Sequence, residues 1–203
     1  SFVKSLSALG AAVTLMGSYN GTATAAESAS PDNQLRKTPL GFDNFSINTT
    51  HWKAGKILEW AAEHRVDGVF FSDLEVYESL EESRLRDLKK KADDLGLFIY
   101  MGGLSICPTS RMFNNKYGTP EEFLLLMIKM ASCLGSPIVR CVLGSRDDRN
   151  VPGGIWTPIR NTVEVLKRVR NQAVDAGVKI AIENHAGDMQ GWELARLVEM
   201  AGK

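Results

Sequence analysis

Three joints of one type most constrain the fold of this chain. At Leu95-Gly96, Leu134-Gly135 and Ala176-Gly177, a helix-ending glycine stands immediately before an apolar, strand-like run. Glycine readily adopts the left-handed backbone conformation that ends helices, so each joint predicts a tight connection from a helix into a strand. A chain that repeats this connection consists of strand-helix units, which is typical of α/β folds with a parallel sheet.

Hydrophobic periodicity places five such units between Leu40 and Lys203. The predicted strands are Leu40–Ile47, Gly68–Ser72, Leu97–Gly102, Pro137–Leu143 and Val178–Glu183. The predicted helices run from Trp52 to Arg65, from Ser79 to Gly96, from Thr119 to Gly135, from Thr157 to Gly177 and from Trp192 to Ala201. Ser79 with Glu82 predicts a capping box, and Thr119 followed by Pro120 predicts another helix start.

Five strand-helix units fit two architectures. An open five-stranded sheet of the flavodoxin type needs about this many residues, whereas a closed (β/α)8 TIM barrel typically needs about 250. The nucleotide-binding form of the open sheet requires a glycine-rich loop after its first strand, but Asp43-Asn44-Phe45-Ser46 stands there instead. In both folds the long connections 106–118 and 145–156 lie at the carboxyl ends of the strands, where functional groups gather.

The N-terminal residues have the layout of an export signal. Lys4 precedes an apolar run from Leu6 to Met16, and small residues follow through Ala25. Residues 1–25 are therefore interpreted as part of a signal peptide, of the twin-arginine type, and residues 26–39 as a linker before the domain at 40–203. The apolar run is too short to span a membrane, so we expect a periplasmic or secreted protein without stable membrane insertion after signal cleavage.

The charge balance argues against a nucleic-acid partner. The chain has 24 basic and 24 acidic residues and a formal net charge of zero. Such a chain has no general positive field to attract a phosphate backbone.

Four side chains are candidates for a functional site at the strand ends. Glu183 directly follows the apolar run Ile180-Ala181-Ile182 and suits a metal ligand or a proton-transferring base, although it could also cap a turn. His185 would share its side of the strand if the extended period of two persists, either to bind substrate or to orient Glu183. Arg140 lies within an apolar strand and needs an anionic substrate or an ion pair, for example with Glu183. Asp73 ends the second strand as a substrate ligand or a turn residue.

The stretch from Ile182 to Asp188 resembles the fifth-strand motif of the xylose-isomerase-like barrels, the sugar phosphate isomerases and epimerases. The likeness extends more loosely from Leu40 to Lys203, and the chain is most similar to secreted members with twin-arginine signals. The resemblance implies a (β/α)8 barrel that binds manganese, magnesium, cobalt or zinc through Glu, Asp, His and Glu on strands five to eight. Only Glu183 of that set is present, so we expect an incomplete barrel of about five βα units, a fragment that is inactive by itself.

The resemblance implies a metal-dependent isomerase or epimerase that transfers a proton through an enediolate, with a small sugar or polyol as substrate. A sugar-binding barrel domain without catalytic activity is the alternative, and homo-oligomer formation is left open. Endonuclease IV shares a similar Glu-Asn-x-Ala-Gly stretch. A multi-zinc endonuclease needs histidines at the ends of strands two to four, where this chain has Asp73, Gly102 and Arg140.

Overall fold

The computed structural model describes residues 38–202, so the predicted signal peptide at 1–25 and most of the linker lie outside the described residues. The strands are β1 (Gly41–Asp43), β2 (Gly68–Phe71), β3 (Phe98–Ser105), β4 (Ile138–Val142) and β5 (Lys179–Glu183). The α-helices are α1 (Ala54–Glu63), α2 (Glu82–Asp94), α3 (Pro120–Leu134), α4 (Trp156–Asp175) and α5 (Gly191–Ala201). Short 3-10 helices occur at η1 (Asn44–Thr50), η2 (Asn115–Tyr117) and η3 (Arg146–Asn150).

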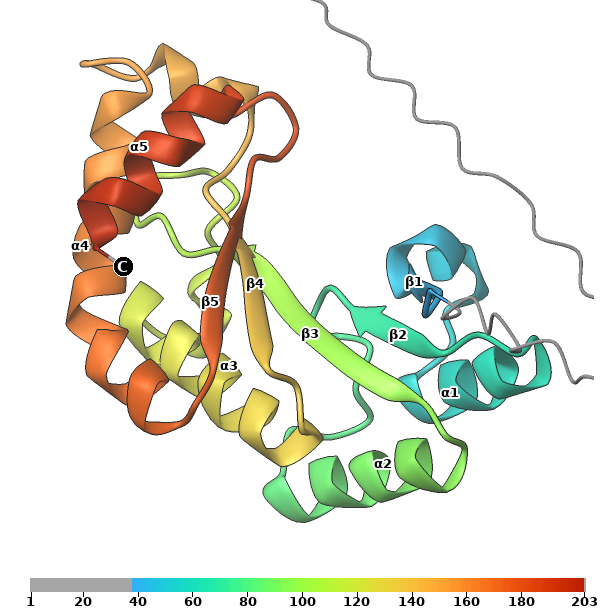
Figure 1. Ribbon diagram of the computed structural model, residues 1–203. Coiled ribbons are helices and arrows are strands. Elements are labelled where there is room, and N and C mark those ends of the chain that lie inside the picture. The colour runs from blue at the N-terminus through green and yellow to red at the C-terminus, as the bar shows by residue number, and fades with distance from the viewer. Residues whose placement is uncertain (1–37, 203) are drawn as a thin grey trace, which may run out of the picture. The chain divides into compact units, whose positions relative to one another are not determined.

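The strands form one parallel sheet in the order β1-β2-β3-β4-β5. Each α-helix packs against the next one along the chain, which requires them to share one face of the sheet, as Figure 1 shows. A flavodoxin-like sheet instead has the order 2-1-3-4-5 with helices on both faces. The open-sheet alternative is therefore wrong, and the arrangement is that of a partial TIM barrel.

The two faces of the sheet differ in chemistry. The helix-facing side chains, such as Phe71, Met101 and Cys141, are fully buried in the hydrophobic core. The alternate residues, among them Tyr100 and Arg140, lie on the opposite face, which no α-helix of residues 38–202 covers. In a closed barrel this face lines the interior, so its polar side chains are placed toward the site at the strand ends.

The three glycine joints are confirmed. Gly96, Gly135 and Gly177 have φ values of 71°, 67° and 66°, and each lies one or two residues after the last residue of a helix. A side chain is strained in this left-handed region, whereas glycine is not. The Thr119 cap is also confirmed, because its hydroxyl accepts from the Glu122 N–H while the Glu122 carboxylate accepts from the Thr119 N–H.

Two local predictions are wrong. The first strand ends at Asp43 instead of Ile47, because the Asp43 side chain accepts a hydrogen bond from the Phe45 N–H at 2.8 Å and starts η1. Ser79 forms no capping box with Glu82. Its hydroxyl accepts from the Glu81 N–H at 3.2 Å, and α2 begins at Glu82 without a side-chain cap.

A buried ion pair ties the start of α5 to the loop after β4. The Glu193 side chain is only 2% exposed and accepts two hydrogen bonds from Arg149, at 2.7 and 2.9 Å. The Gln190 N–H donates to the same carboxylate at 2.6 Å. The Arg149 guanidinium holds the pKa of Glu193 below its ordinary value, although burial acts in the opposite direction.

This pKa difference predicts a pH-dependent stability. Because the pKa of Glu193 is lower in the folded state, its ionised form stabilises the fold above the unfolded pKa of about 4.3, and the stabilisation is lost as pH falls through the folded-state pKa. We expect Glu193→Gln to lower the free energy of urea unfolding at neutral pH, and this difference to shrink toward the lowest pH at which the parent stays folded. A difference that is constant over the whole range would contradict this account.

No helix within residues 38–202 combines the length and the apolar character needed to cross a bilayer.

Candidate functional site

Glu183 and Arg140 meet on the barrel-interior face of the sheet. Glu183 is the last residue of β5, and its Oε2 lies 3.2 Å from the Arg140 Nε. The two positions are two residues apart in register, since Arg140 pairs with Ala181 across β4 and β5. The Arg140 side chain is 12% exposed and that of Glu183 is 46% exposed, so the carboxylate stays accessible from the strand ends.

Arg140 is held from four directions. Its Nη1 donates to the Gly103 carbonyl at 2.9 Å, and its guanidinium lies 4.9 Å from the centre of the Phe70 ring. Its Nη2 is 3.9 Å from Asp43 Oδ2, in addition to the contact with Glu183. The sequence predicted that Arg140 contacts either an anionic substrate or a carboxylate of the protein. The structure shows the second of these, an ion pair with Glu183. Both carboxylates and the ring surround the guanidinium on the barrel-interior face of the sheet.

Asp43 was not among the candidates from sequence. It is the last residue of β1, and besides approaching Arg140 its Oδ1 accepts from the Ser72 hydroxyl at 2.6 Å. The signal was present as a carboxylate after Gly41-Phe42, but the overlong first strand placed Asp43 in its middle. Asp43 thus adds a second carboxylate to the site.

His185 reaches the strand ends by a different route from the predicted one. The strand stops at Glu183, and His185 lies in the following turn, half-buried, with Nδ1 3.1 Å from the Gly144 carbonyl oxygen. A carbonyl oxygen only accepts, so Nδ1 carries the hydrogen in this contact. In the neutral imidazole Nε2 is then an acceptor, and it has no partner among residues 38–202. The extended period that would place His185 on the same side as Glu183 does not persist, because β5 ends at Glu183, but both residues remain at the end of β5.

Asp73 follows β2 and has both oxygens engaged. Oδ1 accepts from the Val76 N–H at 3.0 Å, and Oδ2 accepts from the Asn44 side-chain amide at 3.2 Å. The first contact is the turn role that the sequence left open. Asp73 also lines a small cavity of about 100 Å³ with Gly103 and Asn114, between the ends of β2 and β3. Its substrate role stays a prediction.

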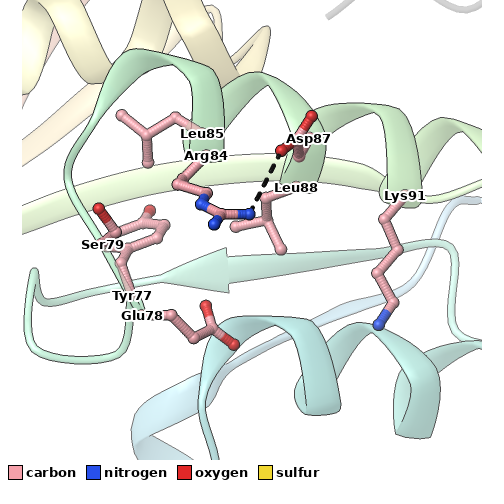
Figure 2. A pocket seen from close by; sticks show the side chains of 8 residues that line it. All are labelled: Tyr77, Glu78, Ser79, Arg84, Leu85, Asp87, Leu88 and Lys91. Carbon is pink, nitrogen blue, oxygen red and sulfur yellow. Dashed lines mark ion pairs between the residues drawn. The ribbon is translucent and has the colours of Figure 1, made fainter.

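A cavity of about 470 Å³ lies elsewhere, between α2 and the loop before it. Figure 2 shows the side chains that line it. Arg84 and Asp87 of α2 approach within 3.9 Å beside it. Tyr77 lines this cavity, and its buried hydroxyl has no hydrogen-bond partner among the described residues. Burial raises the pKa of Tyr77, so the hydroxyl stays protonated. None of the four predicted site residues lines this cavity, so the candidate site is the set of strand ends.

The donor side chains of the described residues do not complete a metal site. Among residues 38–202 there is no group of three or more His, Cys, Asp or Glu side chains that could hold a metal ion. Glu183 can supply one carboxylate ligand, which suits a divalent cation. A complete coordination sphere needs ligands that these residues do not provide.

The exposures of Arg140 and Glu183 predict unequal effects on stability. Glu183→Gln leaves a nearly buried guanidinium short of a counter-charge, whereas Arg140→Met replaces that buried charge with an apolar side chain of similar length. We expect Glu183→Gln to lower the free energy of unfolding by about 1–3 kcal/mol and Arg140→Met to lower it by less. In urea titrations the double variant should lose less free energy of unfolding than the sum of the losses of the two single variants. Additive and equal losses would exclude this coupling.

The chain is similar to a known protein family in sequence and to several solved structures in fold. A family model described as a xylose isomerase-like TIM barrel matches residues 58–203. A D-psicose 3-epimerase crystallised in the presence of D-fructose has a TM-score of 0.61 and 17% identity, with 82% of this chain and 61% of that chain covered. An IolI protein with a bound zinc atom has a TM-score of 0.62 and 16% identity, with 82% and 60% covered. A D-allulose 3-epimerase from Methylomonas sp., in complex with D-allulose, has a TM-score of 0.58 and 17% identity, with 82% and 60% covered.

At these identities the solved structures establish the fold. The chain spans about 60% of the length of these solved chains. No curated protein sequence matches the chain significantly.

Proposed function

The chain belongs to the xylose isomerase-like TIM barrel family, and from this membership we propose that it forms the first five βα units of a divalent-metal-dependent sugar isomerase or epimerase. The observation that carries the proposal is the position of Glu183, a solvent-accessible carboxylate at the end of β5 on the barrel-interior face. Strand ends are where TIM barrels place their catalytic groups. Solved structures of this fold include epimerases crystallised in the presence of D-fructose or in complex with D-allulose, which supports a small sugar as substrate.

The proposed reaction moves a proton at a carbon next to the substrate carbonyl. Glu183 takes this proton, which leaves an enediolate, and a proton returned to the substrate completes the epimerisation or isomerisation. Arg140 holds Oε2 of Glu183, so that Oε1 is the oxygen without a partner among residues 38–202. His185 accepts a hydrogen bond from a substrate hydroxyl through Nε2, and Asp73 is a further substrate contact.

The metal in this proposal is manganese, magnesium, cobalt or zinc. It would be held by Glu183 together with ligands outside residues 38–202, and when bound it would polarise the carbonyl and hydroxyl oxygens of the substrate. A relative with a bound zinc atom shares the fold, which supports a divalent cation. The layout of residues 1–25 supports export to the periplasm or beyond the cell.

Solvent exchange tests the proposal directly. The complete protein, loaded with Mn²⁺, is incubated in D₂O with D-fructose and, separately, with D-tagatose. We expect deuterium to enter the sugar next to the carbonyl, observed by NMR, and the Glu183→Gln variant to lose this exchange while it still folds. Absence of exchange with every ketohexose and aldose tested, in metal-loaded protein, would overturn the proposal.

A sugar-binding barrel without catalysis is the second candidate. In this function Glu183 would be a lone carboxylate without further metal ligands. This function predicts sugar binding by calorimetry, unaffected by chelators and without deuterium exchange. A zinc-dependent endonuclease is not supported, because the ends of β2, β3 and β4 carry no histidine.

A further inference from the structure

We propose that Asp188 is a positioning residue that holds the His185 imidazole in one tautomer, with the hydrogen on Nδ1 and Nε2 kept as an acceptor. The consequence for substrate choice rests on the proposed function, but the tautomer itself does not. Asp188 is a carboxylic residue in the buried interior of the protein, where such side chains are rare.

Asp188 is fully buried and accepts only from backbone groups. Its Oδ2 accepts from the Gly144 N–H at 3.1 Å, and its Oδ1 accepts from the His185 N–H at 2.7 Å and from the Met189 N–H. The carboxylate therefore joins the loop after β4 to the turn after β5. A buried carboxylate is tolerated when several N–H groups donate to it, and these three replace the water that it has lost.

The hydrogen bond from the Gly144 N–H to Asp188 also positions Gly144, the residue whose carbonyl contacts the imidazole. The peptide of Gly144 donates through its N–H to Asp188, and the carbonyl of Gly144 accepts from His185 Nδ1 at 3.1 Å. One carboxylate thus sets both the backbone of His185 and the glycine that receives its ring. If Asp188 no longer accepted these bonds, the two loops would lose the contact that keeps ring and carbonyl in register.

The turn itself is strained. Ala186 has a φ of 47° and Gly187 a φ of 78°, and the Asp188 N–H donates to the His185 carbonyl at 2.9 Å. Both central residues with positive φ are typical of a type I′ turn, which an alanine adopts at a cost. The Arg146 N–H donates to the Ala186 carbonyl at 3.0 Å, and Arg149 donates to the Asp188 carbonyl at 2.7 Å. Contacts from the loop after β4 therefore stabilise a turn that its own sequence does not favour.

The tautomer selects the kind of group that His185 can bind. With Nδ1 donating to Gly144, Nε2 offers a lone pair, which accepts a hydrogen bond from a hydroxyl. A phosphate or carboxylate oxygen needs a donor, which Nε2 of the neutral ring does not supply. In the proposed function, His185 therefore recognises a neutral sugar or polyol hydroxyl rather than the anionic group of a sugar acid or sugar phosphate.

The test is the ¹⁵N NMR spectrum of the histidine side chains. The chain has three histidines, so variants at His51 and His64 assign the His185 signals. The spectra are recorded above about pH 8, where an unperturbed imidazole is neutral. We expect the parent to show His185 with the hydrogen on Nδ1. Asp188→Asn should show a mixture of tautomers, because the amide NH₂ donates where a carboxylate oxygen accepted a backbone N–H. Asp147→Asn, in the exposed part of the loop after β4, should leave the parent pattern unchanged.

The spectrum of the parent alone decides the first half of the proposal, even if Asp188→Asn does not fold. A parent His185 with its hydrogen on Nε2 would overturn it, as would an Asp188→Asn variant that folds and keeps the parent tautomer. Deuterium exchange into sugars is a separate measurement, which tests the proposed function and not the tautomer. A protein that keeps the Nδ1 tautomer but exchanges no deuterium would contradict the proposed function and leave the role of Asp188 standing.

Discussion

Glu183→Gln is expected to abolish the retention of a divalent metal by the complete protein after dialysis. The amide keeps the size of the side chain but removes the negative charge, so the remaining carbonyl oxygen is a weaker ligand for a hard divalent cation than the carboxylate. Loss of an outer-shell partner of a metal ligand already costs about 10–100-fold in affinity, so the loss of a direct ligand should exceed about 100-fold. The measurement is the metal content per chain, by plasma mass spectrometry, after dialysis against metal-free buffer.

Glu164→Gln is the matched control, since Glu164 is an exposed carboxylate of α4 that pairs with Lys167 at 3.6 Å. This variant should retain as much metal as the parent. Equal metal content in the parent and in Glu183→Gln would remove Glu183 from the proposed ligand set, and a metal-free parent would favour the sugar-binding domain. Circular dichroism of both variants separates loss of the ligand from loss of the fold.

The order of the elements was predictable because it depends on short-range signals. Glycines at 96, 135 and 177 end helices through their own backbone preference, and alternating apolar residues such as Val139 and Cys141 follow the period of a strand. The choice between open sheet and barrel was not predictable in this way. It depends on which strands pair and on which face the helices lie, and both are set by packing between distant segments.

The site was predicted where the strand pattern ended cleanly. Ile180-Ala181-Ile182 stops at Glu183, and the structure ends β5 at that residue. The expectation that His185 shares a side with Glu183 required the extended period to persist past Glu183, but β5 ends there and a turn follows, in which contacts from another loop stabilise the left-handed conformation of Ala186. Asp43 was missed for a related reason, since its side chain ends its own strand by accepting from the Phe45 N–H. Side chains that end an element by bonding to the backbone are poorly visible to periodicity.

Gly144→Ala is expected to be the most destabilising of the single substitutions considered. A Cβ at this position would lie 2.0 Å from Asp148 Oδ2 and 2.4 Å from Ser110 Oγ. Both side chains are buried and bonded to each other at 2.9 Å, and Asp148 also accepts from the Ser145 N–H at 2.8 Å. Neither oxygen can retreat without leaving a buried hydrogen-bonding group unpaired, so the conflict cannot be relieved by a simple rotation.

The backbone at Gly144 cannot retreat either, because its N–H donates to Asp188 and its carbonyl accepts from His185. We expect a loss of about 3 kcal/mol or more in the free energy of urea unfolding, from overpacking together with broken buried hydrogen bonds. Gly191→Ala is the control, since no atom lies within 4 Å of a Cβ at the first position of α5, and it should be neutral or stabilising by up to about 1 kcal/mol. If Gly144→Ala folds, the His185 tautomer should become mixed as in Asp188→Asn, because the carbonyl that receives Nδ1 moves. A Gly144→Ala variant as stable as the parent would mean that the loop after β4 is far more adaptable than its buried contacts indicate.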